Sequence, residues 1–243
     1  MKFLLLLHIL ALIYWLGTDL GVYYSSKFIK NTSLSLETRL TVIKIAWLLD
    51  LVPRIAMPLM FFSGIFYAEY VGLVLLSDFA IGLVYLATIV WLGLVGGVYF
   101  GEKYSFHALL RDIDIYFRIF ILFLLWLWVG YSLYYNAIVE KSLQNTSDEV
   151  FDTFEQLIPL VEPLSYWMSA KILIFTITVV CGLGIRYILK PFPNYIKQLV
   201  SDPVSETANA GISQCLKRTT PLVHGIWFCI LLNVLLGLHI INV

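Results

Sequence analysis

Long apolar stretches alternate with short polar segments along the chain. A helix needs about 20 mostly apolar residues to cross a bilayer, and six stretches meet this length: 2–24, 41–67, 73–100, 115–138, 166–189 and 221–242. Lys2 and the following leucines resemble a signal peptide, but no small-residue cleavage motif follows them, so we expect a retained span. The pattern predicts an all-α protein, a polytopic bundle of six transmembrane helices in a single domain over 1–243.

Positive charges concentrate in alternate loops. Lys and Arg mark the cytoplasmic loops of membrane proteins. Of the sixteen Lys and Arg residues, most follow spans 1, 3 and 5: Lys27, Lys30, Arg39, Lys44, Lys103, Arg111, Arg118, Arg186, Lys190, Lys197, Lys217 and Arg218. Only Lys2 and Lys141 lie on the other side. We therefore predict that loops 1, 3 and 5 are cytoplasmic and that both termini lie outside, in a bacterial-type inner membrane.

Two loop segments show an amphipathic pattern. The acidic outer loop 139–165 has a capping residue, Ser147, before acids at the start of a helix. Apolar residues then recur at helical spacing: Phe151, Phe154, Leu157, Ile158 and Val161. This pattern predicts a helix that lies on the outer membrane face or on a partner protein. The inner segment 191–219 begins with PFPNYIKQLV and predicts a similar helix inside.

Composition supports the membrane class. The chain is 60% hydrophobic and 13% charged, with a mean hydropathy of +0.86, whereas soluble domains are about 25% charged. These values exclude a soluble globular protein, a disordered chain and a nucleic-acid-binding protein. Three cysteines lack C-x-x-C spacing and are expected to be small buried residues. The lipid bilayer is thus the first expected partner.

Span 1 carries polar and aromatic residues on one helical face. His8, Trp15 and Asp19 share this face with Leu12 and Val22. Ionisable groups within a span cost about 2.5–3.5 kcal/mol each, so we expect the face to point into the bundle. Asp19 is interpreted mainly as a boundary residue near cytoplasmic lysines.

Spans 2 and 5 carry further charges. Asp50 and Arg54 lie four residues apart, and either form an intrahelical ion pair or leave Arg54 to hold an anion such as a haem propionate or a substrate carboxylate. Lys171 lies about one turn inside the outer end of span 5. It either extends to the interface or has a role facing the bundle.

The four histidines form two candidate pairs. His8 and His239 lie at the same expected outer depth on spans 1 and 6, where two neutral imidazoles can bind one metal ion or both faces of a haem iron. The alternative is two unrelated histidines, each bonded to a neighbouring hydroxyl. His107 and His224 form a weaker candidate pair near the inner side.

The opening segment LHILALIYWLGTDLGVYYSSKFI and the later RIAMPLMFFSGI resemble the membrane-embedded, haem-containing protoporphyrinogen oxidase family, and more loosely the copper-resistance protein D family. The positions that carry the resemblance are His8 with Trp15 and Gly17, and Trp167 with Lys171. It covers spans 1, 2 and 5. It implies that His8 binds a b-type haem and that Lys171 has a functional role. The second family implies copper passage.

Three hypotheses follow. The first is a membrane haem b protein that transfers electrons, with a quinone-linked oxidoreductase subunit as one form of it. His8 and His239 are then the axial ligands, and Arg54 or Lys171 lies near the propionates. The second is a copper or other metal-ion transporter that uses the same histidines. The third is a structural subunit that anchors an outer-face enzyme through 139–165.

Overall fold

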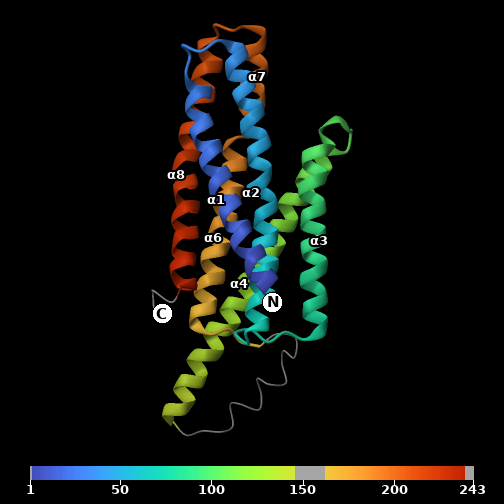
Figure 1. The fold of residues 1–243 in the computed structure, drawn as a ribbon, viewed down its shortest axis with the longest axis vertical. Coiled ribbons are helices and arrows are strands. Elements are labelled where there is room, and N and C mark those ends of the chain that lie inside the picture. The colour runs from blue at the N-terminus through green and yellow to red at the C-terminus, as the bar shows by residue number, and fades with distance from the viewer. Residues whose placement is uncertain (1, 146–161, 239–243) are drawn as a thin grey trace. The chain divides into compact units, whose positions relative to one another are not determined.

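A computed structural model of the protein describes residues 2–145 and 162–238, with side chains up to residue 140 in the first range. Within these ranges the regular structure is helical and contains no β-strand (Figure 1). The elements are α1 (Lys2–Lys30), α2 (Leu36–Tyr70), α3 (Asp78–Phe100), the short 3₁₀ helix η1 (Gly101–Lys103), α4 (His107–Asn145), α6 (Tyr166–Ile188), α7 (Phe192–Ser201) and α8 (Glu206–Gly237).

The six predicted spans are confirmed. Six helical segments in the described ranges are long and apolar enough to cross a membrane: α1, α2, α3, α4, α6 and α8. The chain is therefore a multi-pass membrane protein by length and composition. The outside location of both termini stays a prediction, as does the single domain.

Several helices extend well beyond their apolar stretches. The largest difference is in α8, which begins at Glu206 although we predicted a start at 221. Ala208, Ile212 and Cys215 recur at helical spacing and are buried, so the polar segment before Pro221 already forms one face of the helix. Pro221 lies inside α8 and does not begin it.

Contacts divide the chain into two compact units. The first unit comprises Met1–Leu10, Pro58–Thr176 and Leu232–Val243. The second comprises Ala11–Met57 and Ile177–Leu231. Helices α1, α2, α6 and α8 therefore each contribute residues to both units.

In the second unit, α7 completes a small apolar core. Leu199 of α7 is almost fully buried and packs with Ile29, Ala46, Ala208 and Ile212. The amphipathic helix predicted at the start of 191–219 is present as α7, and its apolar face covers helices of the same chain. Its location on the inner side stays a prediction. Burying this face against α1, α2 and α8 removes it from water, which is what stabilises so short a helix.

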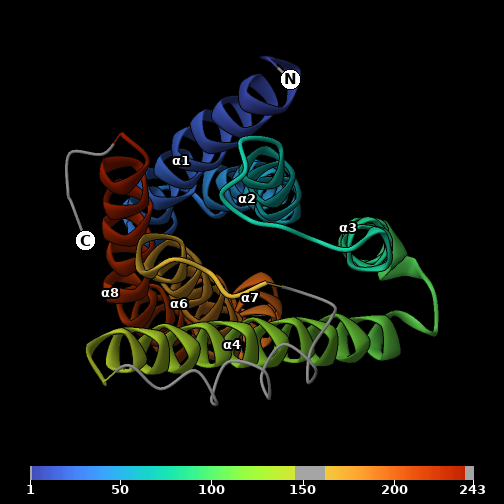
Figure 2. The ribbon, with the colours of Figure 1, turned by 90° about the horizontal axis from the view of Figure 1, so that it is seen from below.

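In the first unit, α3 and α4 form a helical hairpin. Ser77 caps the start of α3 by accepting a hydrogen bond from the amide of Ala80. A Cβ on Gly97 would lie 3.3 Å from Leu110 Cδ1, so the glycine allows a close approach of the two helices. Figure 2 shows α3 viewed along its axis and α4 lengthwise.

A buried ion pair within α4 contacts α3 through its arginine. Arg118 Nε lies 3.1 Å from Asp114 Oδ1, with the side chains 4% and 0% exposed. The guanidinium carbon lies 5.3 Å from the centroid of the Trp91 ring on α3, a cation–π contact. We had assigned Arg118 to an inner loop. It lies inside α4, where Asp114 and Trp91 compensate its burial.

We predict that removing one partner of this pair strongly destabilises the protein. Asp114→Ala leaves the buried guanidinium without its carboxylate and should lower the free energy of unfolding by about 3–5 kcal/mol, whereas the double change Asp114→Ala, Arg118→Met should cost less than the single one. Thermal unfolding in detergent measures both. The matched control is Asp112→Ala, which breaks the exposed Arg111–Asp112 pair and should cost less than about 1 kcal/mol. Equal losses for Asp112→Ala and Asp114→Ala would contradict the prediction.

Candidate functional site

His8 packs against α2 within the first unit. Its Nδ1 lies 3.0 Å from Oγ of Ser63, a fully buried residue in the interior of α2. The next residue, Gly64, has no side chain, and a Cβ there would lie 3.1 Å from His8 Cε1. The Ser63–Gly64 step therefore offers a hydroxyl and the space for the ring. A hydroxyl partner is what the alternative interpretation of His8 expects.

The hydrogen bonds around Ser63 assign the tautomer of His8. Ser63 Oγ lies 2.6 Å from the carbonyl oxygen of Leu59 and donates its only proton there. Towards His8 the hydroxyl must therefore accept, so Nδ1 carries the proton and donates it. In the neutral ring, Nε2 then has the free lone pair. Metal-binding histidines commonly have this arrangement, one nitrogen donating to a neighbour and the other free for the metal.

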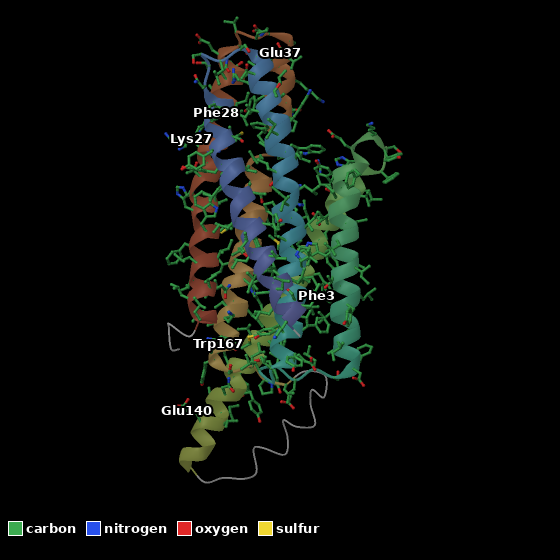
Figure 3. The ribbon with its side chains drawn as sticks, in the orientation of Figure 1. Phe3, Lys27, Phe28, Glu37, Glu140 and Trp167 are labelled. Carbon is green, nitrogen blue, oxygen red and sulfur yellow. The ribbon has the colours of Figure 1, made fainter. Side chains whose placement is uncertain are left out.

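Lys171 and Trp167 together hold the end of α8. Lys171 Nζ donates to the carbonyl oxygen of Asn233 at 3.2 Å, and Trp167 Nε1 donates to that of Leu236 at 3.0 Å. Trp167, labelled in Figure 3, lies at the start of α6, and its ring centroid is 5.0 Å from the ammonium. A positive charge at a helix C-terminus is favoured by the helix dipole. Of the two interpretations of Lys171, the one that faces the bundle is the one found.

Lys171 is also related to His8 within the first unit. The two side chains lie close enough for a Coulomb interaction. The ammonium has three N–H donors and its bond to Asn233 uses one of them. The structure thus brings His8, Ser63, Gly64 and Lys171 into one polar group.

Trp15 and Arg54 belong to the second unit. Trp15 is 2% exposed and buried in the packing of α1. Arg54 forms an ion pair with Asp50 one turn earlier on α2. The intrahelical pair is therefore present. The Arg54 side chain remains 29% exposed, so the pair does not fully enclose the guanidinium.

The other histidines have different surroundings. His107 Nε2 donates to the carbonyl oxygen of Val98 at 3.1 Å, which satisfies a carbonyl at the end of α3. His224 is exposed, and its ring centroid lies 5.5 Å from those of both Tyr23 and Trp227. His239 lies outside the described residues, as does the predicted helix over 148–161. The pairs His8–His239 and His107–His224 therefore stay predictions.

Sequence reasoning missed one residue and one ion pair of interest. Ser63 was missed because a single serine in an apolar span forms no sequence pattern. The available signal for a site was its position next to Gly64. The Asp114–Arg118 pair was missed because both residues were counted with a loop. Their i, i+4 spacing was the available signal. In the described parts of the chain, no three His, Cys, Asp or Glu residues cluster to hold a metal ion.

Comparison with known proteins found no matching family model, no matching curated protein and no matching solved structure. The resemblance of spans 1, 2 and 5 to the haem-containing oxidase family therefore rests only on the residues that carry it, and it stays a prediction.

We predict opposite tautomers for His8 and His107. Nitrogen NMR of the protein labelled in its histidines should show His8 protonated at Nδ1 and His107 protonated at Nε2, because each donates from that atom. Ser63→Ala removes the acceptor of His8 and should change the His8 signals, while the His107 signals stay as they were. A His8 ring protonated at Nε2 in the unaltered protein would contradict the assignment.

We also predict that α8 depends on its two side-chain caps. Lys171→Met and Trp167→Phe each remove one donor to its terminal carbonyls and should each cost about 1 kcal/mol of stability. Hydrogen exchange at the end of α8 should accelerate first, because that end loses its partner. Lys190→Met, which removes an exposed lysine, serves as the control. Unchanged exchange in both cap variants would refute the capping role.

Proposed function

We propose that this chain is an integral membrane haem b protein that takes part in electron transfer, with His8 as an axial ligand of the haem iron. The observation that carries the proposal is the hydrogen bond from His8 Nδ1 to Ser63 Oγ. It orients the ring and makes Nε2 the free nitrogen. When bound, haem supplies one-electron redox chemistry, which the protein tunes through ligation and burial.

The donor set favours a haem over a bare metal ion. Haem iron takes four ligands from the porphyrin and needs only axial donors from the protein. A copper or zinc ion would need about three or four protein ligands. Within the described residues, no three His, Cys, Asp or Glu side chains gather at His8 or elsewhere. This is the chemistry that supports the haem proposal over the copper-transport alternative.

Lys171 is the candidate cation for a haem propionate. It lies near His8 in the first unit and retains N–H donors beyond its bond to Asn233. Arg54, committed to Asp50, is the weaker candidate. A quinone and an outer-face partner protein remain part of the proposal as the electron donor or acceptor.

A reduced-minus-oxidised spectrum of the purified protein, expressed with haem supplied, tests the proposal. We expect a sharp b-type α band that is lost in His8→Ala, because the iron loses an axial ligand. Ser63→Ala should retain the band but weaken haem retention by about 10–100-fold, since it removes the partner that orients the ligand. Ser63→Thr, which keeps a hydroxyl, should restore most of this retention.

His224→Ala is the matched control, because it removes an exposed imidazole of the second unit. Its spectrum should equal that of the unaltered protein. Absence of the α band from the unaltered protein would overturn the proposal. A band that survives in His8→Ala but disappears in His224→Ala would assign the haem to the inner pair instead.

A further inference from the structure

A cavity of about 490 Å³ lies among helix ends in the second unit. Helices α2 and α8 both begin at it, since their first residues, Leu36 and Glu206, line the wall. The lining residues come from the α1–α2 connection, the start of α2, the α7–α8 connection and the start of α8: Thr32, Leu34, Leu36, Arg39, Pro203, Val204, Glu206 and Asn209. Figure 3 labels Glu37, which is near the start of α2.

Arg39 brings a buried positive charge to this cavity. Its residue is 4% exposed, and its Nε donates to the carbonyl oxygen of Ile29 at 2.9 Å. Its Nη nitrogens make no hydrogen bond, and no carboxylate forms an ion pair with it, within the part of the chain that the structure describes. A buried charge without a partner is costly. Arg39 therefore has donors and charge to offer a ligand.

The helix ends add to the preference for an anion. The first amides of a helix point out of it without intrahelical partners, and the helix dipole makes this end positive. Ser35 Oγ accepts from the amide of Thr38, and Ser205 Oγ from that of Ala208, so each cap uses one donor. Two helix N-termini and a guanidinium around one cavity form a site suited to a phosphate group.

The charge and polarity of the surroundings suggest which kind of molecule contains this phosphate group. The second unit holds ten Lys and Arg residues against five Asp and Glu. Leu34, Leu36 and Val204 give the cavity apolar walls, and Val204 is 83% exposed. Glu206 adds a carboxylate, which disfavours a bare anion but can accept from an ammonium group. Asn209 Nδ2 donates to the Ser205 carbonyl oxygen at 2.9 Å.

We propose that this cavity binds the headgroup of a membrane phospholipid, with the phosphate on Arg39 and the ends of α2 and α8, and a headgroup ammonium on Glu206. Phosphoethanolamine is the headgroup that combines a negative phosphate with a positive ammonium group that has N–H donors. The apolar walls receive the glycerol end of the lipid. The proposed haem ligand His8 belongs to the other unit, so this proposal does not depend on it.

Lipid retention by the purified full-length protein tests the proposal. The protein in detergent is titrated with phosphatidylethanolamine, phosphatidylglycerol or inorganic phosphate, and bound lipid is counted by native mass spectrometry. We expect one retained phosphatidylethanolamine. Arg39→Gln should weaken its retention about tenfold or more, because a charged hydrogen bond is lost. Arg218→Gln, which removes an exposed arginine, should leave retention unchanged.

Glu206→Gln tests the specificity independently of the fold, since Glu206 is exposed. It should abolish the preference for phosphatidylethanolamine over phosphatidylglycerol, whereas Glu37→Gln should keep it. Equal retention by the unaltered protein and Arg39→Gln, with the same helical circular dichroism, would overturn the site. Inorganic phosphate that displaces the lipid at equal concentration would overturn the lipid assignment in favour of free phosphate. If Arg39→Gln does not fold, an unchanged preference in Glu206→Gln overturns the proposal.

Discussion

The absence of water from the bilayer core governs the polar contacts of this protein. Each helix ends with carbonyl groups that lack intrahelical donors, and near lipid these groups must find donors within the protein. Long side chains from other segments supply them. Arg39 reaches the carbonyl of Ile29 at the end of α1, His107 that of Val98 in α3, and Trp167 that of Leu236 in α8. Much of the polar chemistry in the spans thus maintains helix ends.

The same constraint explains the charged residues that lie inside helices. Asp50 with Arg54 and Asp114 with Arg118 each pair one turn apart on one helix. Positions one turn apart allow the ion pair to form within a single helix, which lowers the cost of placing either charge near lipid. The two pairs then differ in their surroundings. The pair on α4 is buried against Trp91, whereas the pair on α2 stays partly exposed.

His8 differs from these capping residues. Its partners lie in the interior of α2, namely the Ser63 hydroxyl and the backbone of Met60. The bond to Ser63 therefore serves the imidazole itself and leaves Nε2 for another partner. Arg39 likewise has donors to spare. Its bond to Ile29 uses one of the five N–H donors of the guanidinium. Both proposals rest on these unused hydrogen-bonding groups. His8 keeps a lone pair, and Arg39 keeps N–H donors, that a ligand can use.

The sequence by itself determined the fold class, the six spans and the amphipathic α7. These features depend on local patterns, since hydropathy over about 20 residues and helical spacing need no knowledge of neighbouring helices. The start of α8 was wrong because the hydropathy of its first turns is low, although its buried face is regular. His8 and Lys171 were recognisable as polar residues in apolar spans. Their partners were not, because Ser63 and the carbonyl of Asn233 lie 55 and 62 residues away. Only the tertiary structure brings such residues together, and it therefore decided the tautomer of His8, the cap on α8 and the cavity at Arg39.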